Sequence, residues 1–193
     1  MSNILISEVE SWITHIVRFM PGKIGFMARY FKTRSLFKKS QKCSFGLGCQ
    51  FISPENIELN GFIQFGENSF FTATGGSIKI SGNTSFNMNV HINADIGGKI
   101  EIGESCLIGP NVVMRTADHR FEKSDVIIRN QGHNINDIII EDDVWIAANV
   151  VIVGGVNIGH GTIVGAGSVV TKNIPPMVIA GGVPAKIIKH RIQ

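Results

Sequence analysis

The hydrophobic residues in the last third of the chain recur at a spacing of six. A spacing of six matches neither the 3.6-residue period of an α-helix nor the two-residue alternation of a strand. It is typical of a parallel β-helix, in which each hexapeptide forms one flat face of a triangular coil. The pattern therefore predicts an all-β solenoid. The series consists of Ile140, Ile146, Ile152, Ile158, Val164 and Val170, and all six are β-branched.

The same spacing extends back to about residue 43 in shorter groups. Phe65 and Phe71, for example, are six apart, and short glycine-containing insertions separate one group from the next at what we expect to be one corner. Three hexapeptides make a coil of about 18 residues, so Ile140 should stack against Ile158 in the next coil. This register predicts about seven coils over residues 43–176 and a C-terminal tail over residues 177–193.

Residues 1–42 precede the hexapeptides and have a different pattern. Apolar residues spaced by three or four predict an amphipathic helix over residues 2–20, which Pro21 and Gly22 end. No acidic residue lies between Glu10 and Glu55, and that gap holds eight lysine and arginine residues. The segment is either a helical cap on the first coil, as solenoids require, or a surface that docks on anionic membrane.

Composition narrows the class of protein. The chain has 193 residues, a net charge of +3, 17% charged residues and 22 glycines, which suits one solenoid domain with many turns. Three cysteines without CxxC spacing favour a reducing cytosol, and Cys106 falls at a small core position of a hexapeptide. No signal peptide, membrane-spanning stretch or nucleic-acid motif is evident. We expect a cytoplasmic protein without a nucleic-acid partner, with peripheral contact at the inner face of the membrane as a further option.

The hexapeptide pattern stops after Met114 and resumes at Ile140. The residues between them, 115–139, predict an extended loop, and a long excursion from a regular solenoid is typical of a functional segment. His119 comes five residues after a core position, so the neighbouring coil should hold its backbone firmly. A histidine there can act as a general base near neutral pH. On position alone, a solvated surface histidine is an equally good interpretation.

From about residue 86 the chain resembles the bacterial hexapeptide-repeat acetyltransferases, and within them the galactoside and maltose O-acetyltransferase type and its relatives that acetylate surface polysaccharides. The resemblance rests on ordered strings that span over half the chain: Asn87-Met-Asn-Val-His-Ile, Ile108-Gly-Pro-Asn111-Val, Thr116-Ala-Asp-His119, Glu141-Asp-Asp-Val-Trp145-Ile-Ala-Ala148, Val164-Gly-Ala-Gly-Ser-Val-Val-Thr171-Lys172, Ile174-Pro-Pro176 and Ala180-Gly-Gly-Val-Pro184-Ala-Lys186. It implies a left-handed parallel β-helix and a homotrimer whose sites lie between neighbouring subunits. It also implies transfer of acetyl from acetyl-CoA to a sugar hydroxyl, in building a surface polysaccharide such as O-antigen or capsule.

The resemblance further implies roles for individual residues. The histidine matching His119 takes the proton from the acceptor, and the backbone N–H of Ala148 stabilises the oxyanion. The positions matching Asn87 and Asp95 contact the acceptor, although the insertion at Gly97 weakens the match for Asp95. No metal is implied. The coenzyme lies beside the residues that match its contacts: Trp145, Ala147, Ala148, Ala166, Thr171, Lys172, Lys186 and Lys189.

Structural interpretations of these residues stay open. Asn87 fits an asparagine ladder on the solenoid, Trp145 fits the edge of a coil, and Lys186 and Lys189 fit a solvated basic tail. Ala166 is equally a small turn residue. His91 could approach the acceptor pocket.

Rival functions make different demands on the sequence. The zinc-dependent carbonic anhydrases of this architecture need histidines five residues apart, whereas Met114 and Ser124 flank His119 at that spacing. A non-catalytic scaffold would not need His119, Trp145 and Lys172 together. Within acyl transfer, the alternative to O-acetylation is N-acetylation of a nucleotide-linked amino sugar.

Overall fold

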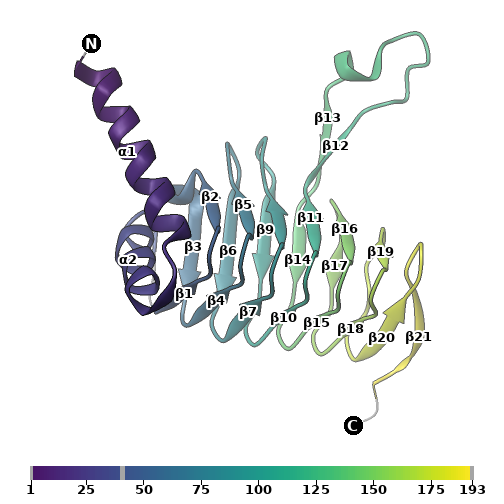
Figure 1. Ribbon diagram of the computed structural model, residues 1–193. Helices are drawn as coiled ribbons and strands as arrows, with labels where there is room; N and C mark the ends of the chain where they lie inside the picture. Colours follow the sequence, from purple (N-terminus) through teal and green to yellow (C-terminus); the bar gives the residue numbers. More distant parts are fainter. Residues whose placement is uncertain (1, 40–41, 192–193) are drawn as a thin grey trace.

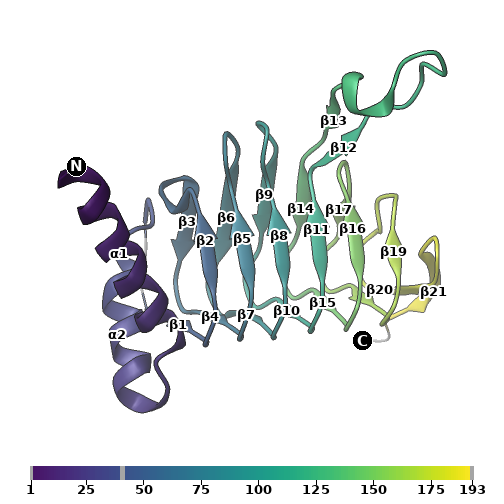
Figure 2. The ribbon, with the colours of Figure 1, turned by 45° about the horizontal axis from the view of Figure 1, so that its top comes forward.

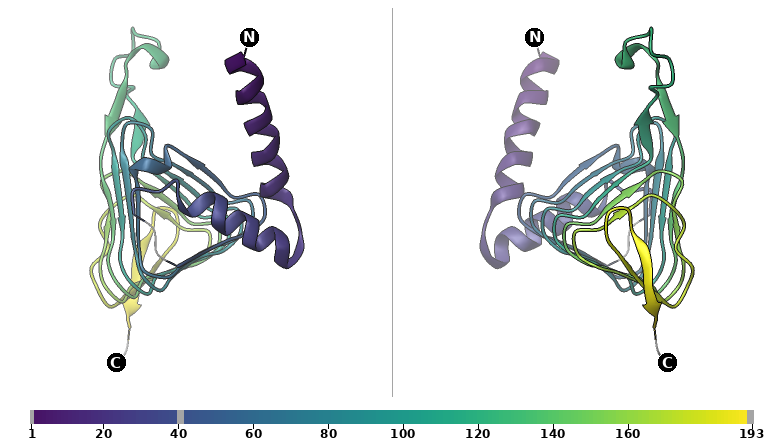
Figure 3. Two further views of the ribbon diagram at one scale, coloured as in Figure 1. Left: turned by 90° about the vertical axis from the view of Figure 1, so that its left-hand side faces the viewer. Right: turned by 90° about the vertical axis from the view of Figure 1, so that its right-hand side faces the viewer.

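A computed structural model of the protein describes residues 2–39 and 42–191. Two helices, α1 (Ser2–Phe19) and α2 (Gly22–Arg34), lead into a parallel β-helix with three flat faces (Figure 1). Figure 3 views this prism from its two ends and shows the triangular outline of the coils. Neither described helix is long and apolar enough to cross a membrane.

Each face is a parallel sheet with one strand from each coil. Face A contains β1 (Cys43–Phe45), β4 (Ile63–Phe65), β7 (Thr84–Phe86), β10 (Leu107–Ile108), β15 (Trp145–Ile146), β18 (Ile163–Val164) and β20 (Val178–Gly181). Face B contains β2 (Gln50–Ile52), β5 (Phe70–Thr72), β8 (His91–Asn93), β11 (Val113–Arg115), β16 (Val151–Val153) and β19 (Val169–Val170). Face C contains β3 (Ile57–Asn60), β6 (Ser77–Ser81), β9 (Lys99–Ile102), β14 (Ile138–Ile140) and β17 (Asn157–Ile158). The chain passes from face A to B to C in every coil, and the six strands of face B correspond to about six turns rather than the seven expected.

The six-residue period places the core as the sequence predicts. Ile140 is paired with Ile158, and the other two expected pairs of neighbouring coils form as well, Ile146 with Val164 and Ile152 with Val170. All six of these side chains are buried. Burying an aliphatic side chain of this size contributes about 1.5–3 kcal/mol, so the stacked rows are the main stabilising term of the solenoid.

The inward row of face A becomes smaller along the axis. Phe45, Phe65 and Phe86 stack nearly parallel, with ring centroids 5.4 and 5.5 Å apart. The same row continues in register through Ile108, Ile146, Val164 and Ala180. The core therefore changes from stacked aromatic rings at the N-terminal end to small aliphatic groups at the C-terminal end.

The corner between faces A and B carries a ladder of asparagine side chains. Asn89, Asn111 and Asn149 all have a left-handed backbone, with φ of 57°, 58° and 59°. Asn89 Nδ2 donates to Asn111 Oδ1 at 3.1 Å, and Asn111 Nδ2 donates to Asn149 Oδ1 at 2.9 Å. Asparagine tolerates this backbone better than most residues. The ladder thus provides both the turn conformation and the contact between coils.

The corner between faces B and C accommodates the insertions, as expected. The glycine-containing strings at Gly76 and Gly98 both lie between a face B strand and a face C strand. A Cβ atom on Gly98 would overlap the side chain of Thr116, so this close stacking of turns requires glycine. The expected loop over residues 115–139 leaves from the same corner, and it contains the antiparallel strands β12 (Ala117–His119) and β13 (His133–Ile135).

The helix α2 covers the open end of the first coil, as the cap interpretation predicts. Pro21 has an extended backbone and separates α1 from α2. Arg29 is buried, and it donates from Nε to the Phe45 carbonyl at 3.0 Å and from Nη1 to the Met20 carbonyl at 2.6 Å. Phe37 continues the aromatic stack onto Phe45, with centroids 5.9 Å apart. The cap is therefore joined to the solenoid by both packing and charge-assisted hydrogen bonds.

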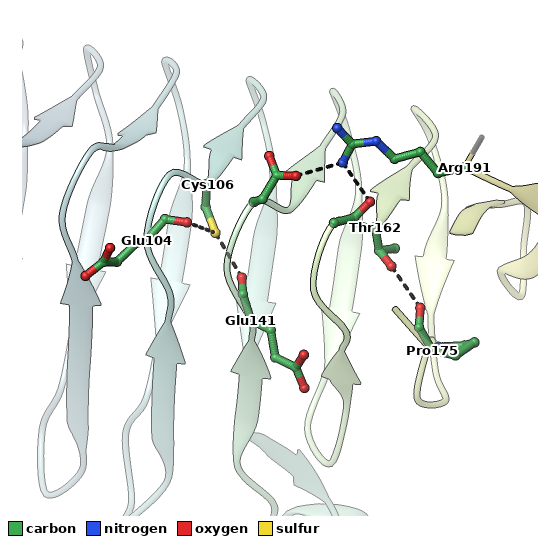
Figure 4. A network of polar contacts seen from close by, with 8 residues as sticks. Glu104, Cys106, Glu141, Thr162, Pro175 and Arg191 are labelled. Atoms are coloured by element: carbon green, nitrogen blue, oxygen red, sulfur yellow. Dashed lines mark hydrogen bonds and ion pairs between the residues drawn. The ribbon is translucent and has the colours of Figure 1, made fainter. Parts of the chain in front are cut away.

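At the other end, the C-terminal segment covers the edge of face A. β21 (Lys186–His190) turns back and pairs antiparallel with β20. Arg191 then donates from Nη1 to Asp143 Oδ2 and to the Gly161 carbonyl, both at 2.9 Å (Figure 4). These bonds connect the last described residue to two coils.

Candidate functional site

His119 is the last residue of β12, on the hairpin that leaves the B/C corner. The hairpin extends well beyond the edge of the coils (Figure 2). Ala117 is buried at its base, whereas Asp118 and His119 are exposed. His119 lies directly opposite His133 of β13, and the two ring centroids are 4.3 Å apart. The prediction that the neighbouring coil holds His119 is wrong, because its backbone is paired with β13 of the same loop. The imidazole is exposed and accessible to a reactant.

The A/B corner contains the three alanines expected beside the coenzyme. Ala147 and Ala148 follow β15, and the Ala148 carbonyl accepts the N–H of Gly167 at 2.9 Å, which places Ala166 in the adjacent turn. Among the hydrogen bonds of the described residues, the N–H of Ala148 has no acceptor. Ala148 is also partly exposed. The corner therefore combines small side chains with backbone donors, the N–H of Ala148 among them, which is the chemistry an oxyanion requires.

Trp145 and Lys189 lie in one outward row of face A. Trp145 is paired with Ile163, Ile163 with Ile179, and Ile179 with Lys189 of the returning strand β21. Strands in a sheet are about 4.8 Å apart, so the indole and the Lys189 backbone are separated by about 14 Å. Lys186 is paired with Gly181, at the end of the sheet nearest the A/B corner. Three of the expected coenzyme contacts, Trp145, Lys186 and Lys189, thus share this part of the molecule with the alanines.

Asn87 lies at the same corner, two coils from Trp145. A shallow groove of about 390 Å³ on face A is lined by both residues, with Ser85, Leu107 and Gly109 between them. Asn87 is not part of the asparagine ladder, because its Oδ1 accepts the N–H of Met88 at 2.7 Å. Its side chain is exposed. The ladder interpretation of Asn87 is therefore wrong, since Asn89 takes that place.

Asp95 lies at the opposite corner and is engaged in the fold. Its Oδ1 accepts hydrogen bonds from Thr72 Oγ1 and from the Thr74 N–H, both at 2.7 Å. The carboxylate of Asp95 therefore stabilises the turn after β5 through Oδ1. Its Oδ2 remains able to accept a hydrogen bond from an acceptor substrate. His91 lies near it on face B, half-buried and edge-on to Phe70 with centroids 4.9 Å apart. Partial burial, followed by the nearby Arg115 guanidinium, lowers the pKa of His91 below its usual range.

Thr171 and Lys172 are exposed and follow β19 directly. They belong to the B/C corner of the last coil, because β19 is a strand of face B and residue 174 already pairs with Ile158 of face C. They are therefore on the side of the prism from which the His119 hairpin extends. Face B separates them from the alanines of the A/B corner.

The predicted residues thus form two groups in one chain. Asn87, Trp145, Lys186 and Lys189 gather with the alanines at face A and the A/B corner, and His119, Asp95, Thr171 and Lys172 lie at the B/C corner. The structure does not bring His119 and Ala148 together within the chain. A site that uses both requires residues from two copies.

Cys49 and Cys106 are unsuited to be nucleophiles. Burial raises the pKa of the Cys106 thiol to about 11, and its Sγ donates to the Glu141 carbonyl at 3.1 Å (Figure 4). Burial likewise raises the pKa of Cys49 to about 11. A thiol with such a pKa is almost wholly protonated at neutral pH. In the described part of the chain, no three histidine, cysteine or acidic side chains are grouped to hold a metal ion.

His133 is a residue that the sequence reasoning did not assign. It contacts His119 only because the loop closes as an antiparallel hairpin, with 13 residues between the two histidines in sequence. An antiparallel pairing of residues 117–119 with residues 133–135 would have indicated this contact, because it places the two imidazoles opposite each other.

Stacked hexapeptide coils are the fold expected of the hexapeptide-repeat transferases, and comparison with known proteins agrees. Residues 137–172 match the family model described as bacterial transferase hexapeptide (six repeats). Repeats of this kind wind into a left-handed β-helix, which gives the hand of these coils.

Several individual proteins are similar to this chain over most of its length. The chain is 37% identical over 142 residues to a galactoside O-acetyltransferase of Escherichia coli, covering 70% of this chain and 68% of that enzyme. It is 36% identical over 160 residues to WbbJ of the same species, assigned as a lipopolysaccharide biosynthesis O-acetyl transferase, covering 73% and 79%. A solved hexapeptide-repeat acetyltransferase of Vibrio cholerae, VCA0836, in complex with acetyl-CoA, has a TM-score of 0.56 and 26% identity, covering 95% of this chain and 85% of that one. The chain belongs to the hexapeptide-repeat acetyltransferase family and is an acyltransferase.

Proposed function

We propose that the protein transfers acetyl from acetyl-CoA to a sugar hydroxyl, in the assembly of a bacterial surface polysaccharide. The acetyl-CoA complex of the similar Vibrio enzyme supports the donor, and the galactoside and lipopolysaccharide relatives support the acceptor class. The three buried cysteine thiols and the acetyl-CoA donor fit an enzyme of the cytoplasm.

The proposal depends on two chemical groups that one chain holds at different corners. The accessible imidazole of His119 lies on the hairpin of the B/C corner, and the N–H of Ala148, which has no acceptor among the described residues, lies at the A/B corner. His119 removes the proton from the sugar hydroxyl, and the hydroxyl oxygen attacks the thioester carbonyl of acetyl-CoA. The N–H of Ala148 then donates to the oxyanion that forms. The C–S bond breaks, the acetyl group stays on the sugar oxygen, and the proton held by His119 passes to the departing thiolate. No acyl-enzyme forms, which is consistent with the protonated cysteines.

Because His119 and Ala148 lie at different corners, we propose that the enzyme works as a homotrimer and that each site is shared by two neighbouring copies. The hairpin, extending beyond the coils, is the part of one copy that reaches the A/B corner of the next. There His119 meets the thioester held beside Ala148, with Asn87 orienting the sugar. Trp145, Ala147 and Ala166 lie along the pantetheine arm. Lys186 and Lys189 of the same copy meet the phosphates of the adenosine end, together with Thr171 and Lys172 from the B/C corner of the neighbouring copy.

The test is an acceptor screen with acetyl-CoA, in which free thiol release is followed over neutral glycans and nucleotide-linked amino sugars. We expect release with a glycan and an ester-linked acetyl group that mild alkali removes. An alkali-stable amide on an amino sugar would overturn O-acetylation in favour of the N-acetyl alternative. Light scattering of the purified protein tests the homotrimer, and a monomer that is fully active would exclude a shared site.

A further inference from the structure

The helix α1 has an apolar face that no part of the described chain covers. At 100° per residue, its large apolar side chains fall within an arc of about 140°. All of them are between 47% and 66% exposed: Leu5, Ile6, Val9, Trp12, Ile13, Ile16 and Phe19. The helix stands clear of the prism along most of its length (Figure 3). A continuous apolar stripe of this size on a soluble surface is uncommon and marks an interaction site.

The apolar stripe faces away from the protein because the other side of α1 makes the contacts. Thr14, Val17 and Arg18 line a small hollow between α1, α2 and the first coil. Arg18 also accepts the Gly48 N–H on its carbonyl at 3.2 Å. On the helix wheel Thr14 and Arg18 lie on the far side from the centre of the stripe, and Val17 lies at its flank. The attachment of α1 to the cap thus orients the stripe outward.

The same part of the chain is strongly basic. Residues 1–42 hold eight lysines and arginines against two glutamates, whereas the remaining residues hold ten against thirteen acidic residues. Lys23, Arg34 and Lys38 are exposed on or just after α2. Arg18 and Lys32 line one hollow together with the apolar Leu36 and Phe51. Cationic and apolar groups are therefore interleaved at this end of the molecule.

We propose that α1 and the basic cap dock the enzyme on the surface of an anionic lipid bilayer, with α1 lying in the interface. Apolar side chains on one face and cations beside it are what an interfacial helix requires. Each lysine or arginine near an anionic surface contributes to binding, and the apolar stripe supplies the second signal that stable anchoring needs. The positive net charge of the first 42 residues favours an anionic bilayer as the partner of the stripe. A second copy of the same segment is disfavoured as the partner, because two positively charged segments repel each other.

Binding is measured by co-sedimentation with vesicles of roughly 30% phosphatidylserine and with neutral vesicles. We expect the full chain to bind the anionic vesicles, and to lose most of that binding between about 0.05 M and about 0.5 M salt. Trp12→Glu places a charge in the stripe and should weaken binding at least tenfold. Ser11→Glu adds the same charge on the neighbouring, polar side of the helix and is the matched control.

The basic contribution is tested separately. Removing two exposed charges of the cap, Lys23→Gln with Lys38→Gln, should weaken vesicle binding about tenfold. Removing two exposed charges from face C, Lys79→Gln with Lys99→Gln, changes the net charge equally and should have little effect. Equal losses in the two pairs would show non-specific attraction and overturn the proposal.

Two further measurements, the oligomeric state and the transferase activity, distinguish docking on lipid from self-association through the stripe. Helix content and oligomer mass should be the same for Trp12→Glu and the unmodified chain, and acetyl transfer to a soluble acceptor should be unchanged. A loss of oligomers with Trp12→Glu would assign the stripe to a second copy and overturn docking on lipid. Acetyl transfer to soluble acceptors is measured separately from vesicle binding. A failure of vesicle binding would therefore leave the proposed function standing, and a failure of acetyl transfer would leave the docking proposal standing.

Discussion

His119 and His133 face each other across the hairpin, with their ring centroids 4.3 Å apart and their backbones in direct antiparallel register. The pairing gives the loop a defined structure at the point where it leaves the B/C corner. Arg120 continues it, donating from Nε to Asn134 Oδ1 at 2.9 Å. The proposed general base is thus held by a small β-ribbon rather than by a flexible segment, which favours a fixed direction of proton transfer.

His119→Ala should lower turnover by about 10² or more, because the acceptor hydroxyl would lose its proton acceptor. Thermal unfolding should be unaffected, since the side chain is exposed and the backbone pairing of β12 is retained. The measurement is kcat for thiol release at saturating acetyl-CoA. Asp118→Ala, at the adjacent exposed position, is the control. A His119→Ala enzyme with near-normal kcat would remove this residue from the mechanism.

Lys172→Ala should raise the dissociation constant of acetyl-CoA about tenfold, because one charge-assisted contact to a phosphate is lost. A saturated reaction should run at nearly the normal rate, since Lys172 lies away from the A/B corner amide. Isothermal titration with coenzyme A measures the effect, and Lys79→Ala on face C provides the matched control. An unchanged dissociation constant would exclude Lys172 from the donor site.

Asn111→Ala should lower the free energy of unfolding by about 2 kcal/mol. It removes two ladder hydrogen bonds and leaves alanine with a φ of 58°. Asn111→Gly loses the same hydrogen bonds without the backbone strain, so its cost should be about 1 kcal/mol. Denaturant unfolding of the two variants separates the contributions. If both variants unfold alike, the left-handed backbone contributes nothing measurable.

The stability of the protein should fall at alkaline pH in part through Cys106. Burial raises the pKa of this thiol from 9.0 to about 11, so the folded state holds the proton more tightly than the unfolded state. Its stabilising contribution is complete below pH 9.0 and is lost as the pH rises to about 11. Cys106→Ser, which cannot ionise in this range, should lose stability less steeply across that interval. Urea unfolding at a series of pH values measures both slopes, and identical slopes would contradict the assignment.

The features that the sequence predicts well are those set by short-range periodicity. Ile140 stacks on Ile158 because a six-residue repeat and three faces permit one register only. Cys106 is buried in the core because its position in the repeat demands a small side chain. The helix over residues 2–20 follows from its apolar spacing in the same way, and α1 covers residues Ser2–Phe19.

Other features depend on contacts that periodicity does not contain. Amphipathicity predicts a helix over residues 2–20, but whether its apolar face is buried depends on how α1 leaves the cap. Asn87 and Asn89 are two residues apart, but only Asn89 belongs to the asparagine ladder, whereas Asn87 binds the N–H of Met88. The geometry of the turn decides which of the two joins the ladder. Asp95 binds Thr72 and Thr74 because an insertion brings those turns together, which no local pattern indicates.

The elements that cover parts of the two ends limit how copies of this chain can associate. The first coil is covered by α2, and the last coil pairs with β21 in the reverse direction, while Arg191 fastens the terminus to Asp143. A parallel β-helix with open ends would expose unpaired backbone groups able to recruit the next molecule, and fibres would grow along the axis. With α2 over one end and β21 along the face A edge of the other, fewer coil edges are open to endwise stacking of copies, and the flat sides remain as surfaces through which a finite assembly can form.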